Sequence, residues 1–192
     1  MITQGNSHNW MSVGMTLLVL GLFAGPTLGA VDMFIKIDGV AGESKDQSHR
    51  DWIDVLSFDM SVSRPIGPAA GGGRAGGQAA EASDLALSKY IDKASPQLAL
   101  ACCDGRHIPE VTLELINTRG GNRTPYMVYK LHNVLVSSYS VSGDTSGDPL
   151  PTEEITLNYE SIEWTYTEFD AANRPKKDKH VSFWDFVMNA FR

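Results

Sequence analysis

Polar and apolar side chains alternate along most of the chain after residue 30, and this period of two is typical of half-buried β-strands. In Ile53–Ser63, Phe58 and Met60 point to one face, while small polar residues occupy the other. The same pattern predicts strands at Val31–Asp38, Leu85–Tyr90, Glu110–Ile116, Pro125–His132, Val134–Val141, Glu153–Tyr159 and Ser161–Phe169. About eight short strands in a chain of this size predict one mainly-β domain, a barrel or a sandwich.

One helix is predicted, near residue 100. Ser95 is a suitable N-cap, Pro96 suits the first helical position and Gly105 provides a stop. The segment between them, Pro96–Cys103, is apolar on all sides, so we expect a buried helix.

Two long segments interrupt the strand pattern. Gly39–Arg50 has the composition of a polar loop, and Arg64–Ser83 combines two prolines with a run of glycines. Gly71, Gly73 and Gly76 formally match a dinucleotide-binding fingerprint, which requires a preceding strand and a following helix. Neither flanks the glycines directly, so we interpret the segment as a long surface loop.

Charge and cysteine content exclude several functions. The net charge of −7 argues against nucleic acid as a partner, because phosphate contacts need a basic surface. Cys102, Cys103 and His107 lie close in sequence, but a zinc site needs four ligands and the chain offers no second pair of cysteines. We therefore expect two buried thiols, no metal and no cofactor.

Enzymatic activity is not expected either, since the chain lacks the Gly-x-Ser-x-Gly elbow of a serine hydrolase and any similar signature. Two features remain that point to interaction. The polar strand face of Ser57, Asp59 and Ser61 is uniformly small and hydrophilic, and the glycine-rich loop is long enough to reach a neighbouring molecule. Both favour a self-assembling protein.

The first 30 residues differ from the rest because they contain no Asp, Glu, Lys or Arg. Met15–Ala24 is apolar but far shorter than a membrane-spanning helix, so no stable membrane span is predicted. The segment is either a secretory signal peptide or an upstream stretch that is not translated, with the true start near Leu28. We divide the chain into residues 1–30 and a β-domain of residues 31–192, and the tail 170–192 has no predicted role.

Several sequence motifs resemble the haemolysin-coregulated protein (Hcp) family. They occur in order between Val31 and about Phe169. The motifs are Val31–Ile37, Gly42–Asp46, Ile53–Leu56, Lys89–Pro96, Leu98–Cys102, Leu135–Tyr139 and Ile162–Thr167. Each is four residues or longer, so the resemblance is specific.

The resemblance implies the structural tube protein of the bacterial type VI secretion system. Such proteins form a β-barrel of two packed antiparallel sheets with one short helix, and assemble into hexameric rings that stack into a hollow tube. A contractile sheath expels the tube beneath a spike, and small effector proteins can travel in its lumen. The chain would assemble in the bacterial cytoplasm and then be secreted. It ends soon after the last motif, which leaves no room for an added effector domain.

The resemblance also assigns site residues. Ser57, Asp59 and Ser61 are expected to face the lumen, although an ordinary outer face of the barrel is the alternative. The loop residues Gly71, Gly72, Gly73, Arg74 and Gly76 are expected to join one ring to the next. Two other interpretations stay open. One is a secreted monomeric β-barrel binding module exported by the N-terminal signal, and the other is a small hydrolase that uses Ser and His.

Overall fold

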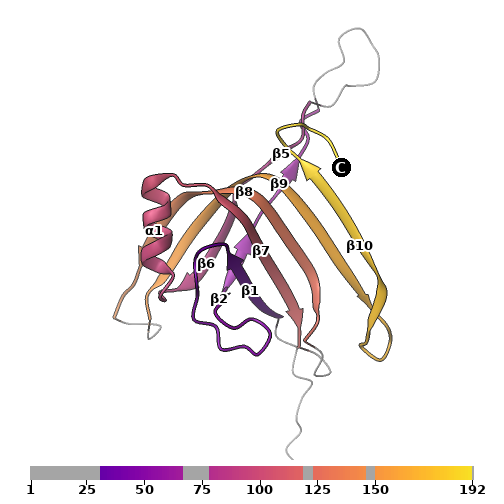
Figure 1. Cartoon of the computed structure of the whole chain (residues 1–192), viewed down its shortest axis with the longest axis horizontal. Helices are drawn as coiled ribbons and strands as arrows, with labels where there is room; N and C mark the ends of the chain where they lie inside the picture. The colour runs from indigo at the N-terminus through magenta and orange to yellow at the C-terminus, as the bar shows by residue number, and fades with distance from the viewer. Residues whose placement is uncertain (1–30, 67–77, 119–122, 146–149, 192) are drawn as a thin grey trace, which may run out of the picture.

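The computed structural model describes residues 31–66, 78–118, 123–145 and 150–191. Over these residues the chain forms an eight-stranded and a two-stranded antiparallel sheet and one α-helix, which confirms the predicted mainly-β fold (Figure 1). The strands are β1 (Val31–Ile37), β2 (Ile53–Asp54), β3 (Ser57–Asp59), β4 (Val62–Ser63), β5 (Glu81–Ala82), β6 (Leu85–Tyr90), β7 (Ile108–Asn117), β8 (Pro125–Ser142), β9 (Thr152–Phe169) and β10 (Pro175–Asp185). The N-terminal segment 1–30 and the interpretations placed on it lie outside the described residues.

The large sheet has the order β2-β1-β7-β8-β9-β6-β3, and β10 pairs with β9. The two longest strands, β8 and β9, pair along almost their whole length. The first half of β9 also pairs with β6, and its second half pairs with β10. One long strand therefore holds two different neighbours on its other edge.

The sheet closes on itself through residues 53–59. Ile53 pairs with Ile35 of β1, and the amide of Val55 donates to the carbonyl of Met33 at 3.0 Å. The next amide, that of Leu56, donates to the carbonyl of Ser88 in β6 at 2.8 Å. This short segment thus crosses from one edge strand to the other. It joins the two ends of the sheet into a barrel without a free edge at that point.

Aliphatic side chains from β1, β6, β7, β8 and β9 fill the barrel, and Leu98 of the helix packs with them. The fully buried ones include Ile35, Leu85, Leu98, Val111, Leu113, Leu131, Ile155, Leu157 and Ile162. Directly paired residues share a face of the sheet, so cross-strand pairs such as Ile35 with Leu113 and Leu131 with Ile162 point inward together.

Helix α1 (Ser95–Asp104) confirms the predicted helix but corrects two expectations about it. Ala94 is the N-cap and Ser95 is the first helical residue, and the hydroxyl oxygen of Ser95 accepts the backbone amide of Asp92 at 3.0 Å. The helix is not buried all round either. It packs against β8, so Leu98 and Ala101 are buried while Leu100 is 54% exposed on the outer side.

The expected pair of buried thiols is also wrong, since Cys103 is exposed and Cys102 only half-buried; both are free. At the end of α1, Gly105 adopts the left-handed φ of 62° and its amide donates to the carbonyl of Ala101, which ends the helix as expected.

The strand pattern correctly located β6, but its boundaries elsewhere need correction. Ile53–Ser63 is not one strand but three short ones, because the chain crosses the barrel closure and then leaves β6. In contrast, β8 and β9 are each continuous where two strands were predicted. The alternation changes phase at Asn133, which has a φ of 51°, so a single strand has the pattern of two.

Two elements project from the barrel. Strands β4 and β5 form a hairpin with their flanking residues, and we define this hairpin (residues 60–66 and 78–83) as the arm. In Figure 1 the arm rises at the end of the molecule where the chain terminates. Strand β10 pairs with β9 along one edge, and Val181 on it is 56% exposed.

A buried ion pair joins β6 to β9. The ammonium of Lys89 donates to Glu153 Oε1 at 2.6 Å, and both side chains are at most 1% exposed. The same ammonium donates to Asp92 Oδ1 and to the Tyr90 carbonyl, each at 2.8 Å. The other oxygen of Glu153 accepts the hydroxyl of Tyr139 at 2.8 Å. This cluster fixes the turn that leads into α1.

Burial raises the pKa of Tyr139 to about 12, and its hydrogen bond to Glu153 adds to the effect. The phenol therefore stays protonated and remains a donor to the carboxylate over the physiological pH range.

Removing Lys89 leaves the carboxylate of Glu153 buried without its cation. We expect Lys89→Met to lower the free energy of unfolding by about 3–5 kcal/mol, measured by urea denaturation at matched protein concentration. Glu153→Gln in the same background should recover part of the loss. Lys93→Met is the control, because Lys93 forms an exposed pair with Asp51 and should cost less than about 1 kcal/mol. Equal losses for Lys89→Met and Lys93→Met would contradict this account.

Candidate assembly surface

Small polar side chains cover the outer face of the sheet where β3, β6, β9 and β8 lie side by side. The strand register aligns them in rows across the four strands. One row is Ser57, Ser88, Glu154 and Ser140, and the next is Asp59, Ala86, Thr156 and Ser138. We call this surface the hydroxyl face and define it by these residues together with Asp84, Ser137 and Asn158.

Hydrogen bonds between side chains hold one edge of the hydroxyl face. Asn158 Nδ2 donates to Asp84 Oδ1 at 2.8 Å, and the hydroxyl of Ser137 donates to Asp84 Oδ2. The hydroxyls of Ser137 and Thr156 lie 2.8 Å apart. The residues of the face include three carboxylates and neither Lys nor Arg. The surface is therefore acidic, small and open to water.

The structure partly unites the residues predicted to face a lumen. Ser57 and Asp59 both lie on the hydroxyl face, opposite Ser88 and Ala86 of β6. Ser61 is also exposed but lies beyond β3, at the base of the arm, where its amide donates to Ser83 Oγ at 2.8 Å. All three are exposed in the single chain, as either a lumen wall or an outer face requires.

Sequence reasoning missed the other members of the hydroxyl face. Glu154, Thr156 and Asn158 alternate with core residues, so their common orientation could be predicted, but not their neighbours across the sheet. The predicted loop residues Gly71, Gly72, Gly73, Arg74 and Gly76 lie outside the described residues. The structure describes the arm on either side of them.

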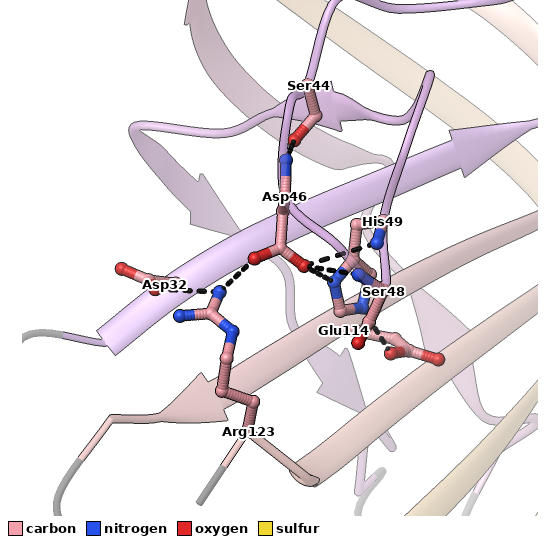
Figure 2. Close-up of polar contacts among 7 residues, drawn as sticks. All are labelled: Asp32, Ser44, Asp46, Ser48, His49, Glu114 and Arg123. Atoms are coloured by element: carbon pink, nitrogen blue, oxygen red, sulfur yellow. Dashed lines mark hydrogen bonds and ion pairs between the residues drawn. The ribbon is translucent and has the colours of Figure 1, made fainter. Parts of the chain in front are cut away.

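A second polar cluster lies on the other side of the barrel, around a buried histidine. Figure 2 shows His49 between two carboxylates. Its Nδ1 is 2.7 Å from Asp46 Oδ1, and its Nε2 is 2.9 Å from Glu114 Oε2. Only an imidazole protonated on both nitrogens can donate to both carboxylates. The ring also stacks on Phe34, with ring centroids 4.3 Å apart and planes 5° apart.

Arg123 extends this cluster to the start of β8. Its guanidinium donates to Asp46 and, at 3.3 Å, to Asp32 of β1 (Figure 2). Burial raises the pKa of Asp46, but hydrogen bonds from His49 and Ser48 and the charge of Arg123 outweigh it, so the pKa lies below its ordinary value. The cluster therefore ties the segment between β1 and β2 to the outer face of β1 and β7.

That segment has the composition of a polar loop, but it is held close to the barrel. A Cβ on Gly42 would lie 2.2 Å from the carbonyl oxygen of Trp52, so no other residue fits there without movement. The amide of Gly42 donates to the carbonyl of Asp51 at 2.8 Å. Ser44 and His49 of the same segment are also buried where it packs against the barrel.

The described parts of the chain hold no group of three or more His, Cys, Asp or Glu side chains that could bind a metal ion. Within the same residues, no helix is long and apolar enough to span a membrane.

Comparison with known proteins decides the family. The sequence model described as "Type VI secretion system effector, Hcp" matches residues 34–166. The chain belongs to the Hcp family. Protein hcp1 of Pseudomonas aeruginosa is 42% identical over 137 residues, which cover 71% of this chain and 83% of that protein.

Solved structures agree with this assignment. A type VI secretion system protein is similar over 85% of this chain and 100% of its own, with a TM-score of 0.79 and 33% identity. Hcp1 from Salmonella typhimurium covers 85% of this chain and 99% of its own, with a TM-score of 0.70 and 29% identity. The Hcp resemblance predicted from the sequence motifs is confirmed.

The two polar clusters explain two of the motifs that carry the Hcp resemblance. Gly42–Asp46 supplies the tightly packed glycine and the carboxylate that holds His49. Lys89–Pro96 supplies the buried ammonium, its partner Asp92 and the start of α1. In this Hcp protein both motifs therefore maintain the barrel.

The lowered pKa of Asp46 predicts a pH dependence of stability. Because the folded pKa is below the unfolded one, the carboxylate stabilises the fold fully above its ordinary value of 3.8 and loses this effect as the pH falls through the folded pKa. We expect Asp46→Asn to lower the free energy of unfolding at neutral pH by about 1–3 kcal/mol. The free energy of unfolding of this variant should also fall less steeply than that of the parent as the pH decreases.

Asp51→Asn is a matched control for this measurement. Asp51 is exposed, pairs with Lys93 and has a φ of 63° that Asn also tolerates. Denaturant titrations of both variants between neutral and acid pH test the expectation. If the free energy of unfolding of Asp46→Asn and that of the parent change with pH in parallel, the protonation of Asp46 does not contribute to the pH dependence of stability.

Proposed function

We propose that this Hcp protein is the structural tube component of a type VI secretion system. Copies of the chain assemble into hexameric rings, and the rings stack into a hollow tube that sheath contraction expels. Two features of the exposed surface support this proposal: a group of apolar side chains on the residues after β10, and the acidic hydroxyl face. A structural role of this kind requires no catalytic centre, in agreement with the family.

An apolar part of the surface lies on the residues after β10, whereas the exposed residues of β10 itself are mostly charged or polar. Val187, Met188 and Phe191 are 69–81% exposed, and Val181 is half exposed on the outer side of β10. Contiguous exposed apolar groups of this kind mark surfaces that are buried by a partner. A second copy of the chain is the partner that a ring provides, and pairing would also use the backbone groups along the edge of β10.

The hydroxyl face has the opposite character. Interface cores are depleted in charge and enriched in aromatic residues, and this face has three carboxylates and no aromatic residue. It is suited to remain in contact with water after assembly. We therefore assign Ser57, Asp59 and the rest of the hydroxyl face to the lumen of the tube, with Ser61 at its margin. Six copies would give an acidic, hydrophilic wall.

Such a wall suits a transported protein that must enter and leave. Small hydrophilic side chains offer few apolar anchors, and the negative potential favours small effectors with a basic or neutral polar surface. The further partners are the contractile sheath and the spike. The protein would assemble in the bacterial cytoplasm and would then be secreted to the extracellular space or into a target cell.

Electron microscopy of the purified full chain tests the assembly. We expect six-fold rings with a central opening and short stacks at micromolar concentration, because the exposed apolar surface favours association. Uniform monomers across the concentration range would overturn the tube proposal. They would favour the alternative, a secreted monomeric binding module.

Gold labelling tests the lumen assignment. In a Cys102→Ser/Cys103→Ser background, Asp59→Cys should accept a small maleimide-linked gold cluster and add density at the centre of each ring. Val181→Cys is the matched control, because we expect its side chain to be covered in the ring and labelled only in dissociated protein. Gold density at the outer rim for Asp59→Cys would contradict the assignment.

A further inference from the structure

The arm is held together by few contacts of its own. Val62 pairs with Ala82 and Ser63 with Glu81, and the amide of Gln78 donates to the carbonyl of Pro65 at 3.0 Å. A two-stranded hairpin of this kind is at best marginally stable alone. Its direction relative to the barrel therefore depends on contacts at its base.

Residues 185–190 form a compact turn beside the arm. The amide of Asp185 donates to the carbonyl of Ala190 at 2.9 Å, and the amide of Ala190 donates back at 3.1 Å. Asp185 also caps the turn, since its Oδ1 accepts the amide of Met188 at 2.8 Å. The amide of Phe186 donates to the carbonyl of Glu160, which fixes the turn to β9. We call residues 185–190 the C-terminal turn.

One side chain of the C-terminal turn reaches the arm. Asn189 has a φ of 49°, a left-handed conformation that Asn tolerates better than most residues. This backbone position places Asn189 Oδ1 3.1 Å from the amide of Ala80, which donates to it. The bond joins two residues that are 109 positions apart in the sequence.

An apolar groove lies beside this hydrogen bond. Its walls come from the arm on one side and from β9 and β10 on the other. The lining residues include Val62, Arg64, Ala80, Trp164, Phe183 and Trp184. The arm and the C-terminal turn therefore meet through a directional polar contact, with an apolar groove beside it.

We propose that the C-terminal turn is a brace that sets the direction of the arm, with Asn189 as the positioning residue, so that the arm meets a second copy of the chain in the next ring. The inference rests on the proposed tube function and adds a role for a segment beyond residues 34–166, the region matched by the family. The brace acts on stacking between rings and not on the barrel, because the contact lies outside the barrel core.

A pair of substitutions at one position tests the brace in the full chain. Asn189→Gly keeps the left-handed backbone but removes the acceptor, whereas Asn189→Asp keeps both. Hydrogen exchange measured by mass spectrometry on a peptide containing Ala80 reports the contact directly. We expect exchange at Ala80 to become roughly tenfold faster in Asn189→Gly and to stay near the parent rate in Asn189→Asp.

Electron microscopy of the same variants reports the consequence. Asn189→Gly should form single rings but lose long stacks, and Asn189→Asp should stack like the parent. Arg74→Glu, in the loop expected to join rings, should also weaken stacking but leave exchange at Ala80 unchanged.

Normal stacking of Asn189→Gly, or unchanged exchange at Ala80, would overturn the brace. A parent chain that forms no rings would instead overturn the tube function, and the exchange measurement would still decide whether the C-terminal turn holds the arm.

Discussion

Closure of the large sheet by residues 53–59 is the constraint on which the other features depend. Two consecutive amides, those of Val55 and Leu56, bond to carbonyls on the two opposite edge strands. Since neighbouring amides of a strand point to opposite edges, a single extended segment can join both without a turn. The closed barrel gives every long strand a defined inner and outer face. The rows of the hydroxyl face exist because closure brings β3 onto β6.

Two polar clusters then attach the irregular segments to this barrel. The Lys89–Glu153 pair is buried in the sheet and holds the turn before α1, while the His49 cluster holds the segment before β2 against β1 and β7. Both use charged groups whose partners are close and numerous, which offsets the cost of burying them. Neither cluster includes a residue of the hydroxyl face, whose own side-chain hydrogen bonds centre on Asp84.

The sequence alone was sufficient for the strand class, the position of α1 and the family resemblance, because alternation, end signals and motifs are local. It could not give the length of β8, since Asn133 shifts the alternation in the middle of that strand, nor the length of β9, where the consecutive residues Ser161 and Ile162 are both buried. It also could not identify the cluster of His49, whose partner Glu114 is 65 residues away. The lumen candidates Ser57 and Asp59 were found from their own strand. The rest of their face required the register of three further strands.

The distribution of exposed side chains connects the single chain to an assembly. The apolar side chains of Val187, Met188 and Phe191 are exposed on the C-terminal residues, and the acidic hydroxyl face lies where β3, β6, β9 and β8 meet. In the proposed ring, a neighbouring copy would cover the apolar residues, and the hydroxyl face would stay in contact with water. The arm and the C-terminal turn meet beside these apolar residues, so in the proposed assembly the contacts within a ring and the contacts between rings would share one region of the chain.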